Sequence, residues 1–207
     1  LGADDNATGV AGLLELARVL AADHDRSLDV ACWDEAARGE VGSPAWAARA
    51  AGQGVDVVQY VNLDMIGYAD ATVGAQQMPS GLEAVYGDAY GTLEDIEFRG
   101  DFLWTFFDKP AQPFARTYLA LGDDLGRTAI GIQVPTALRD ASFLQNSDHA
   151  AVWAQGWPAA HLGDTGDLRN ANYHCFVGDD VVDTLVNAHA GDTLRAAAGA
   201  CVTVLER

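Results

Sequence analysis

Basic residues are scarce in this chain of 207 residues. It has 12 Lys and Arg against 30 Asp and Glu, a formal net charge of −18, and Lys109 is its only lysine. Proteins that hold a phosphate backbone do so with clustered Lys and Arg. The composition therefore excludes nucleic acid as a partner. The acidity is typical of a well-solvated surface, and a salty or extracellular habitat is the alternative explanation.

Long apolar runs and paired cysteines are also missing. No uninterrupted apolar stretch approaches the roughly 18 residues of a spanning helix, and no basic region precedes an apolar one as in a signal peptide. We therefore expect neither a membrane span nor a signal peptide. Cys32, Cys175 and Cys201 share no C-x-x-C spacing, which argues against a disulfide framework and a cysteine zinc cluster. The compartment stays open, with a secreted or periplasmic location slightly favoured over a cytoplasmic one.

Hydrophobic residues make up 49% of the chain, which is enough for the core of one domain. Strand-like and helix-like segments alternate, which predicts an α/β fold whose mostly parallel, mixed sheet is sandwiched by helices. The chain opens at Leu1 with L-G-A-D-D-N, which reads as the middle of a motif. We therefore expect a single domain over residues 1–207 that is incomplete at its amino terminus.

Hydrophobic periodicity and helix-start signals predict the order of the elements. The expected helices are a core helix capped by Asn6 or Thr8 that buries Val10, Leu13, Leu14, Ala17 and Leu20, then 43–51, 111–125, one from about Asp148, and one from about Asp180 to Leu205. The expected strands are 27–34, 55–68, 128–134 and 157–163. Residues 69–110 are rich in Gly, Pro, Asp and aromatics without a steady period, so we expect a loop-rich insertion that leaves the sheet.

Acidic and imidazole side chains follow strand ends or precede helices, where parallel sheets present functional residues. Asp4 and Asp5 precede the first helix, and taken alone this placement favours a helix cap over a metal site. Asp64 ends an apolar strand, where a metal ligand and a structural ion pair are equally good explanations.

Two further segments carry histidine. In S-D-H (147–149) a capping role for Ser147 or Asp148 and a supporting role for His149 are favoured over metal binding. His174, in N-Y-H-C (172–175), is the best ligand candidate among the five histidines, whereas His24 and His189 are expected at the surface. Carboxylates and an imidazole at several strand or helix ends are the ingredients of a zinc site with oxygen and nitrogen ligands.

The motifs themselves resemble those of metallopeptidase family twenty-eight, the co-catalytic di-zinc aminopeptidases and carboxypeptidases. The matching segments are G-A-D-D-N-A-T-G-V-A-G-L-L-E-L-A, G-S, N-L-D-M-I-G-Y, S-D-H, D-T-G-D-L-R-N-A-N-Y-H and D-T-L. They occur in the family's order over nearly the whole chain. The resemblance implies a zinc-exopeptidase fold, up to two zinc ions as cofactor, and a peptide as substrate or ligand.

The resemblance also implies residue roles. Asp5 matches the aspartate that bridges the two ions, Asp64 the terminal aspartate on one ion, and His174 the terminal histidine on the other. Tyr173 matches a tyrosine that helps to hold the oxyanion of the tetrahedral intermediate in some members. Asp4, Asp148 and His149 are expected to contact and orient these ligands without binding the metal themselves.

Two parts of the family pattern do not appear. A histidine on the first ion is expected upstream of G-A-D-D-N, outside this chain, and a glutamate pair is replaced by Ala36 and Ala37 in the segment W-D-E-A-A-R-G-E-V-G-S. Each ion would keep two of its three protein ligands and bind weakly. Alanine cannot accept a proton from water, so Glu35, or alternatively Glu40, would have to replace the general base.

Three functional hypotheses follow. The first is an aminopeptidase-like zinc hydrolase that removes amino-terminal residues from peptides, with activity impaired by the two alanines. The second is a non-catalytic relative that binds a peptide or protein. The third is a truncated copy, which would expose unpaired sheet edges and tend to aggregate.

Overall fold

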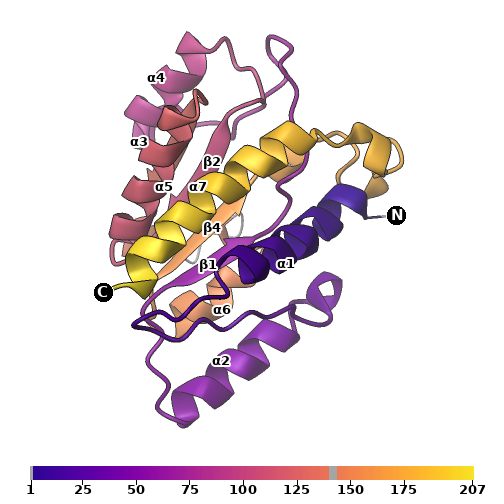
Figure 1. Ribbon diagram of the computed structural model, residues 1–207. Helices are drawn as coiled ribbons and strands as arrows, with labels where there is room; N and C mark the ends of the chain where they lie inside the picture. Colours follow the sequence, from indigo (N-terminus) through magenta and orange to yellow (C-terminus); the bar gives the residue numbers. More distant parts are fainter. Residues whose placement is uncertain (1, 140–143) are drawn as a thin grey trace.

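The computed structural model describes residues 2–139 and 144–207. Its elements in chain order are α1 (Gly9–Val19), α2 (Gly42–Gly52), β1 (Tyr60–Leu63), α3 (Leu82–Val85), α4 (Gly87–Asp95), β2 (Leu103–Phe107), α5 (Gln112–Asp124), β3 (Ala129–Gln133), α6 (His149–Ala154), β4 (Ala159–Gly163) and α7 (Asn187–Leu205), joined by loops and short helical turns (Figure 1). No helix in this part of the chain is both long and apolar enough to cross a bilayer.

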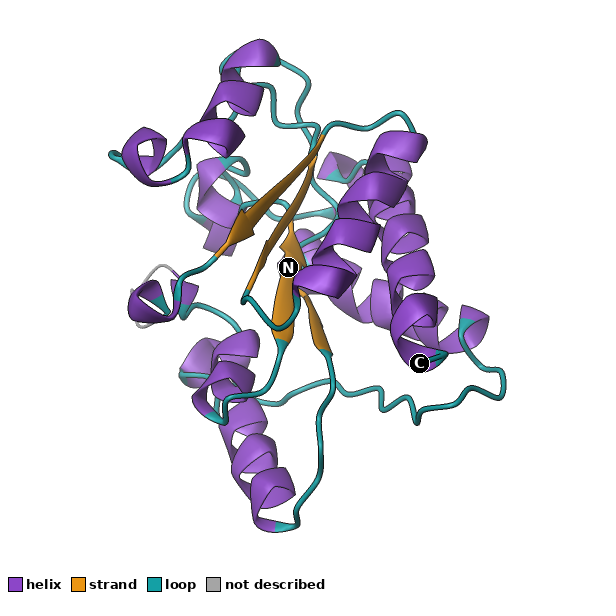
Figure 2. Ribbon diagram, turned by 90° about the vertical axis from the view of Figure 1, so that its left-hand side faces the viewer, coloured by secondary structure: helices purple, strands orange, loops and turns teal. Residues whose placement is uncertain are grey.

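The four strands form one mixed sheet in the order β1-β4-β2-β3. β1 runs parallel to β4 and β2 parallel to β3, while β2 and β4 are antiparallel. All five residues of β2 are buried because the strand is central and has helices on both faces. Figure 2 shows the twisted sheet between its helices. The predicted α/β architecture, a mostly parallel mixed sheet sandwiched by helices, is confirmed.

Each face of the sheet has its own hydrophobic core, because side chains alternate across a strand. Leu103 and Phe107 of β2 pack with α1, α5 and α7, whereas Trp104 and Phe106 pack with α3, α4 and α6. Small residues let α7 lie close to α5, since Ala196, Ala197 and Ala200 are fully buried there. The second core is the more aromatic one, and it borders the cavity described below.

Most predicted elements appear near their expected positions, including α2, α5, β3, α6 and β4. The apolar run 55–68 pairs only over Tyr60–Leu63. The range 69–110 does leave the sheet at first and forms α3 and α4, but it returns as β2 at Leu103. The expected helix from about Asp180 begins instead at Asn187, after a short turn over Val182–Thr184.

Three expectations were wrong in detail. Residues 27–34 form no strand, because no neighbouring strand pairs with them in the described structure. Val10 and Leu14 are 44% and 64% exposed, so α1 buries a narrower stripe than expected. His189 is buried rather than superficial, because it lies where α7 packs against the rest of the fold.

Candidate functional site

The loop before α1 holds Asp4 and Asp5, and it is fixed by contacts with distant parts of the chain. The Asp180 carboxylate accepts hydrogen bonds from the backbone N–H groups of Asp4 at 2.9 Å and Asp5 at 3.0 Å. Asp4 is fully buried, and its carboxylate accepts from the Gly67 N–H at 3.0 Å and the Asn170 amide at 2.9 Å. Both carboxylate oxygens of Asp4 therefore accept hydrogen bonds that hold the loop. Asp5, rather than Asp4, has its carboxylate available to bind a ligand.

Asp5 meets His174 directly, although the two lie near opposite ends of the sequence. The His174 Nε2 atom is 3.2 Å from Asp5 Oδ2. The imidazole stacks on the ring of Tyr173, with centroids 3.9 Å apart. His174 has a φ of 52°, in the left-handed region that residues other than glycine seldom adopt. Burial raises the pKa of Asp5, and the nearby His174 partly opposes that rise.

Asp64 follows β1 and is held by a chain of polar side chains. The Asn62 amide donates to Ser147 Oγ at 2.7 Å, and the Ser147 hydroxyl donates to Asp64 Oδ2 at 2.5 Å. Burial raises the pKa of Asp64 to about 6, the Ser147 hydrogen bond lowers it, and the charge of Asp5 raises it again. With a pKa of about 6 this carboxylate is mostly ionised at pH 7 and takes up a proton on mild acidification.

Asp148 and His149 lie where α6 begins. Burial raises the pKa of Asp148, and its Oδ1 atom has no hydrogen-bond partner among the described residues. His149 is fully enclosed, its Nε2–H donates to the Leu144 carbonyl at 2.8 Å, and its ring packs edge-on against Phe106 and Trp153. Burial lowers the pKa of His149 to about 4, so the ring is neutral and serves packing.

The two candidate replacement bases differ in their surroundings. Glu35 is exposed, and its carboxylate lies 3.4 Å from the Arg38 guanidinium on the short turn Ala36–Arg38. Glu40 is half-buried, and its pKa rises to about 7 because of burial and the charges of Asp148 and Asp64. Glu40, rather than Glu35, therefore shares the electrostatic environment of the site carboxylates.

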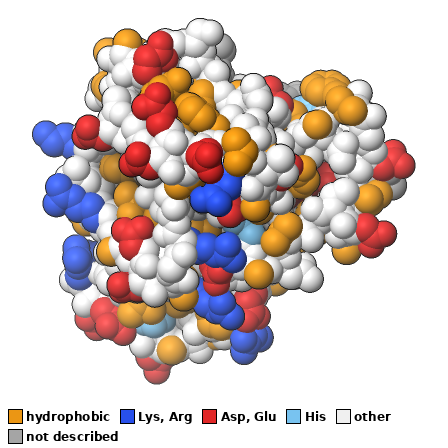
Figure 3. Space-filling model, turned by 90° about the horizontal axis from the view of Figure 1, so that it is seen from above, with side chains coloured by type: hydrophobic (Ala, Val, Ile, Leu, Met, Phe, Trp, Pro, Cys, Tyr) orange, Lys and Arg blue, Asp and Glu red, His pale blue; other side chains and the backbone are white. Residues whose placement is uncertain are grey.

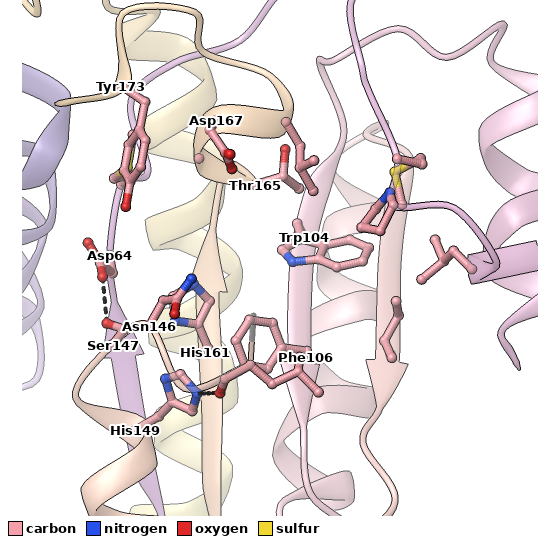
Figure 4. A pocket seen from close by; sticks show the side chains of 18 of the residues that line it. Asp64, Trp104, Phe106, Asn146, Ser147, His149, His161, Thr165, Asp167 and Tyr173 are labelled. Atoms are coloured by element: carbon pink, nitrogen blue, oxygen red, sulfur yellow. Dashed lines mark hydrogen bonds between the residues drawn. The ribbon is translucent and has the colours of Figure 1, made fainter. Parts of the chain in front are cut away.

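A cavity of about 300 Å³ opens beside Asp64 and Tyr173. Figure 4 shows the phenol of Tyr173 pointing toward Asp64 at one end, with Trp104 and Phe106 across the cavity. The remaining wall is mostly apolar and includes Met65, Met78, Leu82, Ile132, Leu144 and Leu168. A space of this size and lining suits a ligand with an apolar side chain in the cavity and a polar group that lies against the carboxylates.

The residues fit a zinc ion in part. Two ligands of one tetrahedral zinc lie about 3.4 Å apart, and the Asp5–His174 contact of 3.2 Å is close to that separation. Carboxylate and imidazole are also suitable donors. However, no three His, Cys, Asp or Glu side chains within 2–139 and 144–207 are grouped so that they could hold one ion. The predicted ligands Asp5 and His174 are in contact. The Asp64 carboxylate is instead hydrogen-bonded to Ser147.

Sequence reasoning missed a buried network that supports the site from the loop after β4. Asp164 is fully buried, and its carboxylate accepts from the N–H groups of Tyr68 at 3.2 Å and Gly166 at 3.0 Å. Burial, and then the charge of Asp4, raise its pKa well above the usual range. Arg169 is also buried, and its Nε donates to Gln76 at 3.0 Å.

A signal for this network was present in the sequence. Asp164 and Arg169 belong to D-T-G-D-L-R-N, which follows β4 as Asp64 follows β1. Because these strands are parallel neighbours, their carboxyl ends lie at the same edge of the sheet.

Comparisons with known proteins identify the family of the chain. The sequence model described as "Peptidase family M28" matches residues 1–199. The chain is 33% identical over 183 residues to the uncharacterized protein YfbL of Escherichia coli, a match that covers 84% of this chain and 51% of that protein.

Solved structures show the same fold. Two crystal structures of the LapA aminopeptidase of Legionella pneumophila resemble this chain with a TM-score of 0.71 and 19% identity, over 100% of this chain. The match covers 49% of one LapA chain and 48% of the other. The chain thus spans about half the length of the relatives it matches. Because the M28 sequence model matches nearly the whole chain, the chain belongs to peptidase family M28.

Proposed function

We propose that this chain is a zinc peptidase domain of the aminopeptidase type, which receives the amino-terminal end of a peptide and places an apolar first side chain in the cavity beside Asp64. The observation that carries the proposal is the Asp5–His174 contact next to Asp64 and Tyr173 at the mouth of an apolar cavity. Hydrolysis is impaired in this chain because Ala36 and Ala37 stand where the family has its glutamate pair.

Zinc fits this proposal because family M28 is generally zinc-dependent. Asp5 and His174, which are in contact, would hold one ion together, and Asp64 would become a ligand only after its carboxylate turns away from Ser147. When bound, zinc supplies a Lewis acid that polarises the scissile carbonyl and makes water more acidic. The carboxylate of Asp4, with both oxygens engaged, would keep Asp5 in place rather than act as a ligand.

Tyr173 can stabilise developing negative charge. Burial, and then the charges of Asp5 and Asp64, raise its pKa to about 12, so the phenol stays protonated at neutral pH. A protonated phenol can donate a hydrogen bond to an oxyanion.

Glu40 is the better candidate for a replacement base. A general base works best when its pKa lies near the working pH, and the pKa of Glu40 is about 7. Glu35 is exposed and beside Arg38 instead. Without any base, activity falls about a hundred- to ten-thousandfold.

A second candidate function is peptide binding without hydrolysis. The observation that favours it is the loss of both glutamates at Ala36 and Ala37, while the cavity and its polar rim remain. This function needs only the recognition of an apolar side chain and a peptide end.

The test combines zinc content with hydrolysis of leucine 4-nitroanilide. We expect zinc to co-purify below one ion per chain, to fall further in His174→Ala, and to be unchanged in the control His24→Ala. We expect weak hydrolysis that is lost in Glu40→Gln and kept in Glu35→Gln.

Two outcomes would redirect the proposal. Hydrolysis that depends on Glu35 would identify the other base. The second outcome is that hydrolysis is absent and stays absent in the double variant Ala36→Glu, Ala37→Glu. If calorimetry still measures binding of leucinamide to that protein, then peptide binding is the function.

A further inference from the structure

One wall of the cavity comes from residues 69–102, the excursion between β1 and β2. The excursion supplies four residues to this wall, namely Met78, Pro79, Leu82 and Tyr86. Tyr86 lies between α3 and α4, and it packs against the second hydrophobic core, which includes Trp104 and Phe106. Figure 4 shows these two rings across the cavity from Asp64. Tyr86 therefore belongs to the side of the cavity that lies opposite this carboxylate.

Two residues of the cavity wall carry a polar atom without a hydrogen-bond partner. The Tyr86 hydroxyl and the His149 Nδ1 atom are both shielded from bulk solvent, and neither has a partner within residues 2–139 and 144–207. Because the His149 Nε2–H donates to the Leu144 carbonyl, the Nδ1 atom of the neutral ring is an acceptor. An unpaired polar atom in such surroundings costs free energy, and a ligand that supplies the missing partner recovers it.

The rest of the cavity favours a neutral aromatic side chain. The buried rings of Trp104 and Phe106 line it, and aromatic rings pack well against one another. Among the described residues that line the cavity there is no lysine or arginine, and Asp64 and Asp167 bring only negative charge. An acidic first side chain would therefore be repelled. The lining suits an aromatic ring that carries an uncharged polar group.

We propose that the cavity recognises a tyrosine as the first residue of the peptide, and that the hydroxyl of this tyrosine pairs with the hydroxyl of Tyr86. The inference rests on the proposed function, and it makes Tyr86 the residue that determines which first side chain is preferred. The ring of the ligand would lie against Trp104 and Phe106, with its amino end toward Asp64. A phenol both donates and accepts, so it can accept from Tyr86 and offer its own proton to the His149 Nδ1 atom.

Other first side chains satisfy the cavity wall less completely. Phenylalanine and leucine fill apolar space but leave the Tyr86 hydroxyl without a partner. A site that hydrogen-bonds a ligand hydroxyl rejects the analogue without that group more strongly than an apolar pocket rejects a side chain that is one methylene shorter. The preference should therefore appear as a ratio of affinities between two ligands that differ only in the hydroxyl.

The test compares tyrosinamide with phenylalaninamide, which lacks only the phenol hydroxyl, by calorimetry on the purified chain. We expect tyrosinamide to bind about tenfold more tightly or better. In Tyr86→Phe the two affinities should become equal, with that for phenylalaninamide retained, because the change removes only the hydroxyl. The matched control is Tyr90→Phe, which should keep the wild-type ratio, since the Tyr90 ring packs on Phe98 and is not part of the cavity wall.

Three results would overturn the inference. The first is equal binding of the two amides to the wild type, with leucinamide bound as well, which would leave the proposed function standing and show that the cavity selects only by apolar volume. The second is a preference for tyrosinamide that survives Tyr86→Phe, which would show that another group recognises the hydroxyl. The third is that none of the three amides binds, in which case the proposed function fails and this inference fails with it.

Discussion

Neighbouring residues of the same type have different surroundings here. Asp4 is fully buried with hydrogen bonds to both carboxylate oxygens, whereas the Asp5 carboxylate is partly exposed and lies beside the His174 imidazole. The pair D-D alone does not distinguish the two aspartates, and it was the family resemblance that assigned the metal to Asp5. The difference arises because the turn before α1 directs the Asp4 carboxylate inward, toward Gly67 and Asn170, and the Asp5 carboxylate toward His174.

His189 gives a pH prediction at this scale. Burial, and then the charges of Arg169 and Arg127, lower its pKa from 6.5 to about 3, while Asp192 opposes the shift. Because the unfolded chain binds the proton more readily, the stability contributed by the neutral ring is present above about pH 6.5 and is lost as the pH falls toward 3. Between pH 7 and pH 5 this loss is about 2 kcal/mol.

The measurement is urea unfolding of the wild type and His189→Leu at both pH values. The wild type should lose about 2 kcal/mol more than the variant on acidification. The comparison removes the opposite contributions of Glu40 and Asp64, whose raised pKa values favour the folded state as the pH falls. At pH 7 the variant should fold well, because neither ring nitrogen of His189 has a hydrogen-bond partner in the described structure. Equal losses in the two proteins would show that His189 is accessible to protons in the folded state.

Among the elements, α1 is joined tightly to β1. The Asn6 amide donates to the Leu63 carbonyl at 2.9 Å, and its oxygen accepts from the N–H groups of Gly9 at 3.1 Å and Met65 at 2.9 Å. A Cβ atom at Gly9 would overlap both the Asn6 side chain and the Leu63 carbonyl. The first turn of α1 therefore requires glycine.

We expect Gly9→Ala to lower the free energy of unfolding by about 3 kcal/mol, because overpacking adds to lost hydrogen bonds. The matched change Gly91→Ala lies in α4, where a Cβ meets nothing within 4 Å. That variant should gain about 0.5–1 kcal/mol from helix propensity. Urea denaturation measures both. A Gly9→Ala protein as stable as the wild type would mean that α1 can move away from β1 at little cost.

The helices were largely predictable because their signals are local. The proline in the first turn of α5 and the spacing of Phe114, Tyr118 and Gly122 on its buried face can be read from the sequence. The segment 27–34 was not predictable in the same way, because a strand exists only where a partner offers backbone groups. The apolar composition of residues 27–34 therefore cannot show whether a partner strand is present.

The candidate site was predictable to the level of residues but not of geometry. Motif order alone brought Asp5 and His174 into one hypothesis, and the structure places their side chains in contact. The separation of Asp64, its hydrogen bond to Ser147, and the orientation of Glu40 depend on how α6 and the loop before α2 pack. No local pattern encodes such packing. The roles of these residues in zinc binding and catalysis remain predictions.

At the scale of the whole molecule, the net negative charge affects the stability of the fold. Acidic side chains are scattered over the face seen in Figure 3 rather than gathered in one patch. With 30 acidic and 12 basic residues, self-repulsion opposes the compact state. Salt shortens the Debye length from about 30 Å at 0.01 M to about 3 Å at 1 M.

We therefore expect added KCl to stabilise the fold. Raising it from 10 mM to 500 mM should increase the free energy of unfolding in urea by on the order of 1 kcal/mol. NaCl at equal ionic strength should act alike if screening is the cause. A decrease with salt would mean that attractive ion pairs, such as Arg139 with Asp108 at 2.8 Å, outweigh the repulsion.

The hydrogen bonds from the Asp4 and Asp5 backbone N–H groups to Asp180 also determine at what stage of folding the site can form. Asp4 and Asp180 are 176 positions apart in the sequence. Contacts of such separation pay a large loop-closure entropy and form late in folding. Residues 174–177 are exposed, in contrast to the buried Asp4, so the His174 segment should be the first part of the site to open in the native state. Any ligand that bridges the Asp5 loop and the His174 loop would thus act as a clasp, closing a ring that spans most of the polypeptide.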